Sequence, residues 1–104
     1  MAKIPPIVMV EVFPPVVLSP DGGFREVTPA NGIDFKLGEL TAFIDDGDIE
    51  VLYLGNGTLL VFDEDGKGKE LPLNPVATGL AKSVIHDGDY IAGPALWCTE
   101  DQVL

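Results

Sequence analysis

The stretch from Asp46 to Phe62, Asp-Gly-Asp-Ile-Glu-Val-Leu-Tyr-Leu-Gly-Asn-Gly-Thr-Leu-Leu-Val-Phe, predicts a β-hairpin. Its arms run from Ile49 to Leu54 and from Thr58 to Phe62, and Gly55-Asn56-Gly57 supplies the turn. β-Branched and aromatic residues favour strands, and an Asn-Gly pair between two such runs is a strong hairpin signal. We expect the rest of the chain to be built around this hairpin.

The first arm of the hairpin is apolar on both faces. Alternate residues of a strand point to opposite sides. One side therefore carries Ile49, Val51 and Tyr53, and the other carries Glu50, Leu52 and Leu54. This pattern predicts a central strand covered on both sides, by helices on one side and by a partner subunit or the N-terminal segment on the other.

The residues before the hairpin predict strands followed by a short helix. Ile7 to Phe13 is a β-branched run bounded by prolines, and Val16 to Leu18 is expected to pair with Phe24 to Thr28 across the turn Ser19-Pro20-Asp21-Gly22-Gly23. Asp34 is the expected N-cap of the helix. Its apolar positions follow helical spacing and are Leu37, Leu40, Thr41 and Ile44.

The residues after the hairpin predict a second helix and a last strand. Asn74 is a favourable N-cap, and Pro75 is favoured at the first helical position. The apolar stripe of this helix is Ala77, Leu80, Ala81 and Val84. A strand is expected from Tyr90 to Cys98. The chain is therefore predicted to be α+β, a mostly antiparallel β-sheet with two short helices packed on one face.

Length and composition indicate one domain, residues 1–104. The chain has 104 residues, of which 46% are hydrophobic, enough for one modest core. No apolar run approaches the roughly 18 residues that cross a bilayer, and two prolines interrupt the N-terminal apolar stretch. We therefore expect no membrane association, no signal peptide and a cytoplasmic location, the host cell cytoplasm if the protein is phage-encoded.

The chain carries a formal net charge of −11, with 17 acidic residues against 6 Lys and Arg. Such a surface repels the phosphate backbone, which argues against direct nucleic-acid binding. Two interpretations stay open: the charge provides solubility, or it mimics a polyanion toward a basic partner.

From about residue 31 to 98 the chain resembles the family called domain of unknown function 3846, small proteins found mainly in phages, plasmids and their hosts. The most specific match is Leu71-Pro72-Leu73-Asn74-Pro75-Val76-Ala77-Thr78. Further matches lie in residues 35–40, 49–51, 63–66 and 89–96. The resemblance implies a mobile-element accessory protein but no catalytic residue. It divides the chain into an N-terminal β segment (1–30), a family-like core (31–98) and a loose tail (99–104).

The N-terminus of the second helix is the candidate ligand site, because free N–H groups at a helix start attract phosphate or carboxylate. Helical spacing aligns Asn74, Thr78 and Lys82, Arg25 is the chain's one guanidinium, and Trp97 is available to stack on a base. The alternative is that Asn74 caps the helix and Trp97 fills the core.

Two similar loops suggest a metal cluster as a weaker alternative. Ile44-Asp45-Asp46-Gly47-Asp48-Ile49 and Ile85-His86-Asp87-Gly88-Asp89-Tyr90 would offer His86 and several aspartates if they lay side by side. The single cysteine, Cys98, excludes an internal disulfide and is expected to be buried on the last strand. No metal or other cofactor is predicted.

Together these features predict a non-catalytic accessory binding protein of the phage or plasmid type that acts on a host pathway, for example against host defence. It would sequester a small nucleotide-like ligand. One alternative is an acidic protein–protein inhibitor or DNA mimic that blocks a host protein, and another is a small metal-dependent enzyme. Edge strands and a small core favour a homo-oligomer.

Overall fold

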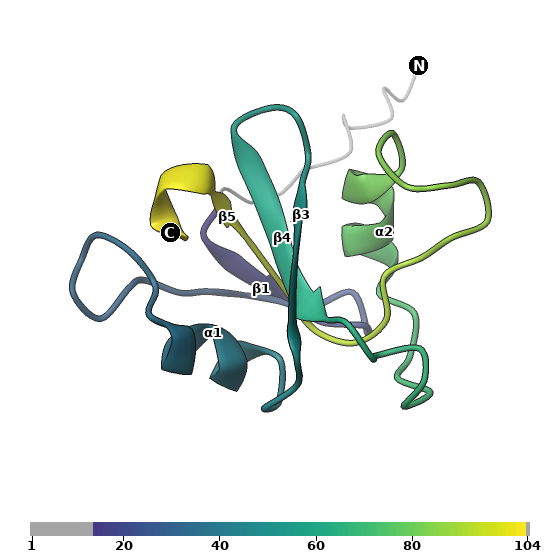
Figure 1. Ribbon diagram of the computed structural model, residues 1–104, viewed down its shortest axis with the longest axis horizontal. Coiled ribbons are helices and arrows are strands. Elements are labelled where there is room, and N and C mark those ends of the chain that lie inside the picture. Colours follow the sequence, from purple (N-terminus) through teal and green to yellow (C-terminus); the bar gives the residue numbers. More distant parts are fainter. Residues whose placement is uncertain (1–13, 104) are drawn as a thin grey trace, which may run out of the picture.

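The computed structural model describes residues 14–103, which form a five-stranded antiparallel sheet and two α-helices (Figure 1). The elements are β1 (Val16–Leu18), β2 (Phe24–Glu26), α1 (Leu37–Phe43), β3 (Ile49–Tyr53), β4 (Thr58–Asp63), α2 (Pro75–Ala81), β5 (Ala95–Thr99) and the 3-10 helix η1 (Glu100–Gln102). The strand order is β2-β1-β5-β4-β3. The predicted α+β class with a mainly antiparallel sheet is confirmed. The strand expected at residues 7–13 lies outside the described residues.

β3 and β4 form the predicted hairpin, with Val51 opposite Val61. Gly55 and Gly57 have φ angles of 84° and 85°. Residues with a Cβ rarely adopt such angles, so the turn depends on its glycines. The hairpin between β1 and β2 is also confirmed, with Val17 opposite Arg25.

β3 is an edge strand, which corrects the prediction that it is central. The middle of the sheet is β5, which pairs with β1 on one side and β4 on the other. The two-sided apolar pattern of β3 has a different cause. Ile49 and Val51 pack with the core on the α1 face, whereas Leu52 packs with the core on the α2 face.

The two helices lie on opposite faces of the sheet, so the prediction of both on one face is wrong (Figure 1). Leu40 of α1 packs in one core cluster with Leu59, while Ala77 of α2 packs in the other with Leu60. Leu59 and Leu60 are neighbours on β4 and therefore point to opposite faces. Both faces of β4 are apolar, so each face needs its own helix. Within residues 14–103 no helix is long and apolar enough to span a membrane.

The start of α1 differs from the prediction, because Lys36 and not Asp34 is the N-cap. The Glu39 carboxylate accepts hydrogen bonds from the Lys36 N–H at 2.7 Å and the Ala30 N–H at 2.8 Å. Asp34 instead accepts a hydrogen bond from the Asn31 amide at 2.7 Å. The Glu39 carboxylate, which makes the N3 half of a capping box, therefore sets the helix start.

The last strand is shorter than predicted, and the segment that follows it is packed against the rest of the protein. β5 begins at Ala95, after Gly93 with a φ of 83°. The described part of the tail, residues 99–103, is packed rather than loose. The Phe35 N–H donates to the Gln102 carbonyl at 2.8 Å, and Val103 packs on the α1-side core.

A buried carboxylate fixes the turn that follows the hairpin. Asp63 is 3% exposed and accepts hydrogen bonds from the Lys69 ammonium at 2.7 Å and the Asp65 N–H at 2.9 Å. A Cβ on Gly47 would lie 2.4 Å from an Asp63 carboxylate oxygen, so position 47 has no room for a side chain. Burial raises the pKa of Asp63, but the Lys69 ammonium and the Asp65 N–H outweigh it and hold that pKa below its ordinary value.

We predict that Lys69→Met lowers the midpoint of urea unfolding at neutral pH, because Asp63 is left buried without its counter-ion. The folded pKa of Asp63 lies below its unfolded value of about 3.9, so its contribution to stability is present above that value and lost as pH falls through the folded pKa. The difference between wild type and variant should therefore shrink in acid. The control is Lys36→Met, which removes an ion pair with Asp34, a carboxylate that is less buried than Asp63. A midpoint unchanged at neutral pH would contradict the prediction.

Candidate functional site

A groove of about 380 Å³ lies between α2 and the loop that follows it, and we call it the α2 groove. It has an apolar part and a polar part. The apolar and glycine lining is Leu73, Pro75, Gly79, Ile85 and Gly88, and the polar lining is Thr78, Lys82, His86, Asp87 and Asp89. Its volume falls within the range of small-ligand pockets, about 300–1,000 Å³. Mixed apolar and polar walls of this kind suit a small polar molecule.

Two of the five predicted site residues, Thr78 and Lys82, line the α2 groove together. The Thr78 hydroxyl accepts a hydrogen bond from the Ile91 N–H at 3.0 Å, which orients it. Of the four lysines in residues 14–103, three pair with a carboxylate: Lys36, Lys67 and Lys69. Within this described part, the Lys82 ammonium has no carboxylate within 4.0 Å. Its charge is therefore available to an incoming anion.

The loop of residues 82–89 supplies three groove residues that were not predicted as ligand-binding: His86, Asp87 and Asp89. Asp89 pairs with Lys67, and this ion pair is the main cause that lowers the pKa of its carboxyl. The loop turns back on itself through the Asp89 N–H, which donates to the His86 carbonyl at 2.9 Å. In the sequence, Asp87-Gly88 indicates only a turn, so no local signal places these residues beside α2.

Asn74 is fully buried and lies outside the α2 groove lining. Its amide NH₂ donates to the carbonyls of Leu18 and Gly93, both at 2.9 Å, and its side-chain oxygen accepts from the Ala77 N–H at 3.1 Å. The predicted N-cap is confirmed. Because these bonds engage both the oxygen and the NH₂ group, Asn74 acts as a structural residue, as the alternative interpretation held.

Arg25 and Trp97 lie apart from the α2 groove. Arg25 projects from β2 over the Phe43 ring, 5.9 Å from its centroid, on the α1 face of the sheet. The Trp97 ring packs against the α2-side core, and its indole N–H donates to the Thr58 hydroxyl at 3.0 Å. The structure thus brings Thr78 and Lys82 together but places the other three predicted residues elsewhere.

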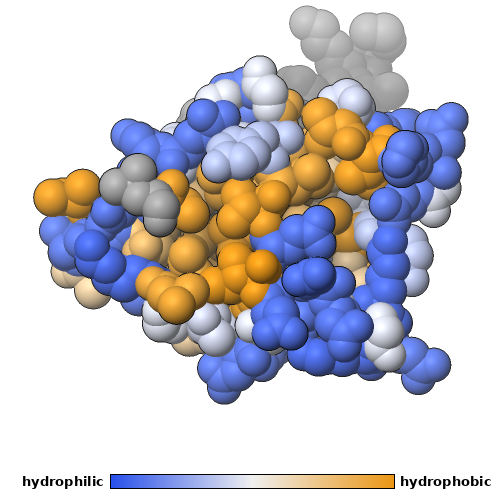
Figure 2. Space-filling model, in the orientation of Figure 1, coloured by the Kyte–Doolittle hydropathy of each residue, from blue (hydrophilic) through white to orange (hydrophobic). Residues whose placement is uncertain are grey.

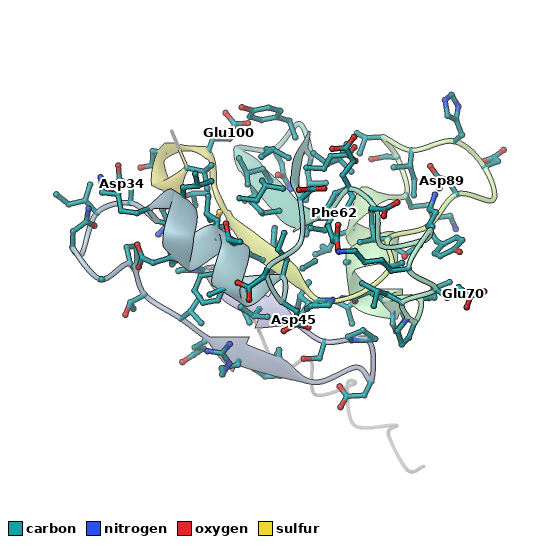
Figure 3. The ribbon with its side chains drawn as sticks, turned by 60° about the horizontal axis from the view of Figure 1, so that its bottom comes forward. Asp34, Asp45, Phe62, Glu70, Asp89 and Glu100 are labelled. Carbon is teal, nitrogen blue, oxygen red and sulfur yellow. The ribbon has the colours of Figure 1, made fainter. Side chains whose placement is uncertain are left out.

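The two Asp-Gly-Asp loops do not meet. Figure 3 shows Asp45 and Asp89 well separated in the molecule. They line different hollows, Asp45 with Arg25 and Asp89 with Lys82. Among residues 14–103, no group of three or more His, Cys, Asp or Glu side chains is arranged to hold a metal ion. The sequence similarity of the loops therefore does not produce a shared site.

Cys98 is buried on β5, as predicted. Burial, with a smaller contribution from Asp101, raises the pKa of its thiol to about 12. The thiolate is the nucleophilic form of cysteine, so at neutral pH Cys98 is an inert core residue.

A family model described as "Domain of unknown function (DUF3846)" matches residues 16–103. The match confirms the resemblance and extends it from residue 31 back to β1 and β2. No curated protein and no solved structure matches the chain.

We predict that Asn74→Ala lowers the free energy of unfolding by about 2–4 kcal/mol, since the helix loses its cap and two carbonyls lose their donors. Asn74→Asp keeps the cap acceptor but turns a carboxylate toward both carbonyls, so it should cost at least as much. Urea denaturation measures both. The control is Asn56→Asp, because the exposed Asn56 side chain only accepts hydrogen bonds from Thr58. Wild-type stability in Asn74→Asp would show that only the cap matters.

Proposed function

The chain belongs to the family described as domain of unknown function DUF3846, and we propose that it is a non-catalytic binding protein that holds a small nucleotide-like ligand in the α2 groove. The observation that carries this proposal is the position of Lys82. Within residues 14–103 it is the lysine without a carboxylate partner, and it stands at the edge of a hollow of ligand size.

The lining of the α2 groove is complementary to a nucleotide in three ways. Lys82 and His86 offer cationic or hydrogen-bonding contacts for phosphate oxygens. The carboxylate of Asp87 is an acceptor for ribose hydroxyls or an exocyclic amine. Leu73 and Ile85 provide an apolar surface for the flat face of a base. A simple anion would use only the first of these contacts, whereas a nucleotide uses all of them.

The hydrogen bonds of the Thr78 hydroxyl favour a binding role over a catalytic one. An activated threonine nucleophile needs a neighbouring base that takes its proton. The Thr78 oxygen instead accepts a hydrogen bond from the Ile91 N–H, a backbone donor. The same hydroxyl donates to the Ile91 carbonyl at 3.5 Å, so both of its hydrogen bonds go to the backbone of Ile91 and hold Thr78 as a fixed part of the groove wall.

The net charge of −11 repels an anionic ligand at long range, so the affinity must come from contacts inside the groove. The wider setting that we propose is an accessory protein of a phage or plasmid that withdraws such a ligand from a host pathway. Blockade of a host protein by the acidic surface is the competing mechanism, and the first experiment below separates the two.

We predict that native mass spectrometry of the full chain, purified from a bacterial lysate, shows an adduct of nucleotide mass. Titration with nucleoside mono-, di- and triphosphates should then shift the amide NMR signals of Thr78, Gly79 and Lys82. Inorganic phosphate should produce smaller shifts, because it lacks the base and ribose. A retained polypeptide without a small adduct, together with no shift for any nucleotide, would reject ligand binding and favour host-protein blockade.

Lys82→Gln should weaken the binding of the best nucleotide by about tenfold or more, since it removes one charge-assisted contact. The matched control is Lys36→Gln, which changes the net charge equally but lies at the start of α1 on the opposite face of the sheet. Both variants should unfold at nearly the wild-type temperature. Equal loss of binding in the two variants would mean that overall charge, and not the groove, governs affinity.

Gly79→Leu should block the groove without harm to the fold. Gly79 is helical and lines the groove, and a Cβ at this position would meet no atom within 4 Å. Leucine is a better helix former, so stability should rise by about 0.5–1 kcal/mol while nucleotide binding is lost. Gly38→Leu on α1, where space is equally open, should show the same gain in stability with binding intact. Intact binding in Gly79→Leu would place the ligand elsewhere.

A further inference from the structure

β3 ends the sheet that residues 14–103 form, and one side of its backbone has no strand partner among them. The Leu54 N–H donates to the Thr58 carbonyl and the Glu64 N–H donates to the Asp48 carbonyl, and these bonds bracket the β3–β4 ladder. Hydrogen-bonded pairs alternate along an antiparallel ladder, so the even-numbered residues from 48 to 54 face β4. The backbone groups of Ile49, Val51 and Tyr53 point away from the sheet, and no described residue pairs with them.

This edge has few of the devices that usually protect an exposed strand. Short length, lysine, proline and bulges discourage edge pairing. β3 has five residues, Ile-Glu-Val-Leu-Tyr, with a regular register to β4, no lysine or proline, and Glu50 as its one charged residue. In contrast, β2 at the other edge has only three residues and carries Arg25 and Glu26. β3 lies at the front of the molecule in Figure 1, and Figure 2 shows hydrophobic surface over the middle of that face.

We propose that β3 pairs with the β3 strand of a second copy of this chain, antiparallel about a two-fold axis at Val51, to form one continuous ten-stranded sheet. Val51 then faces the second copy's Val51, and Ile49 faces the second copy's Tyr53. Each strand contributes the N–H and C=O groups of its three outward residues, so three donors on each of two strands make six hydrogen bonds. No outward backbone group is left over.

The distribution of charge along β3 selects this register. With the axis at Val51, Glu50 lies opposite the second copy's Leu52, and Asp48 lies opposite the second copy's Leu54, so no acid faces an acid. A shift of the axis to residue 50 would set two Glu50 side chains directly opposite each other, which is destabilising. A parallel pairing in register would do the same at both acidic positions.

The side chains on the α1 face complete the interface. Tyr53 is 60% exposed at the end of β3, although it is large and aromatic. In the paired sheet its ring lies across from the second copy's Ile49, an aromatic and β-branched pair of the kind that stabilises sheets. The paired β3 strands thereby give Tyr53 a covered environment that a single copy does not provide.

The test is sedimentation of the full chain over a concentration series at low and high NaCl. Each copy carries a net charge of −11, so repulsion opposes pairing and its screening by salt should increase the dimer fraction. Hydrogen exchange of the β3 amides tests which residues pair across the dimer interface. The amides of Ile49, Val51 and Tyr53 should gain protection as the dimer forms, whereas those of Glu50 and Leu52, which face β4, should be protected at every concentration.

Val51→Lys sets two lysines opposite each other at the axis and should weaken the dimer by at least about tenfold, even though it lowers the net charge. Tyr53→Asp acts at a position that is 60% exposed, outside the core, and should weaken the dimer too. Phe24→Asp makes the same charge change at the β2 edge, where Phe24 is 45% exposed, and should leave the dimer intact.

Several results would overturn the proposal. One is a monomer at every concentration and salt level, including a monomer whose outward β3 amides are always protected by another segment of its own chain. Another is a dimer that persists in both β3 variants. A dimer lost in Phe24→Asp would assign the interface to β2 instead.

Discussion

The hydrogen bonds of the buried Asn74 side chain are the interaction on which the arrangement of this protein depends. They join three separate parts of the chain: the end of β1 at Leu18, the approach to β5 at Gly93, and the first turn of α2 at Ala77. α2 has only seven residues, too few to be stable on its own. Its position on the sheet, and with it the α2 groove, is therefore fixed by a side chain that never reaches the groove.

The second constraint is the pair of apolar faces on β4. Each face needs cover, so α1 and α2 are divided between the two sides and neither protects the sheet edges. Within residues 14–103, the helices thus cover both faces of the sheet, while the outer backbone groups of β3 have no strand partner. This separates two kinds of surface: the α2 groove is a local hollow above one face, whereas the β3 edge is a line of backbone groups that can pair with another strand.

Charge is distributed unevenly in a chain with few cations. Most lysines of residues 14–103 are held by carboxylates, including Lys69 with the buried Asp63 and Lys67 with Asp89. These pairs organise the turn after β4 and the loop after α2. Because Lys67 neutralises Asp89 at the groove wall, Lys82 stands in a less acidic environment than the net charge of the chain would indicate.

Local sequence patterns were sufficient to predict three features: the β3–β4 hairpin from its alternation and Gly-Asn-Gly turn, the α2 start from Asn74-Pro75, and the buried Cys98. These follow from propensity, turn chemistry and short-range periodicity, which act over a few residues. Thr78 and Lys82 were also predictable together, because they lie four residues apart on one helix. The same patterns did not predict which face each helix covers, that β3 is an edge, or that Arg25 lies on the other side of the sheet from Lys82. Strand order and face assignment depend on contacts between residues far apart in the sequence, such as Asn74 with Leu18. A pattern within a few residues does not indicate such contacts.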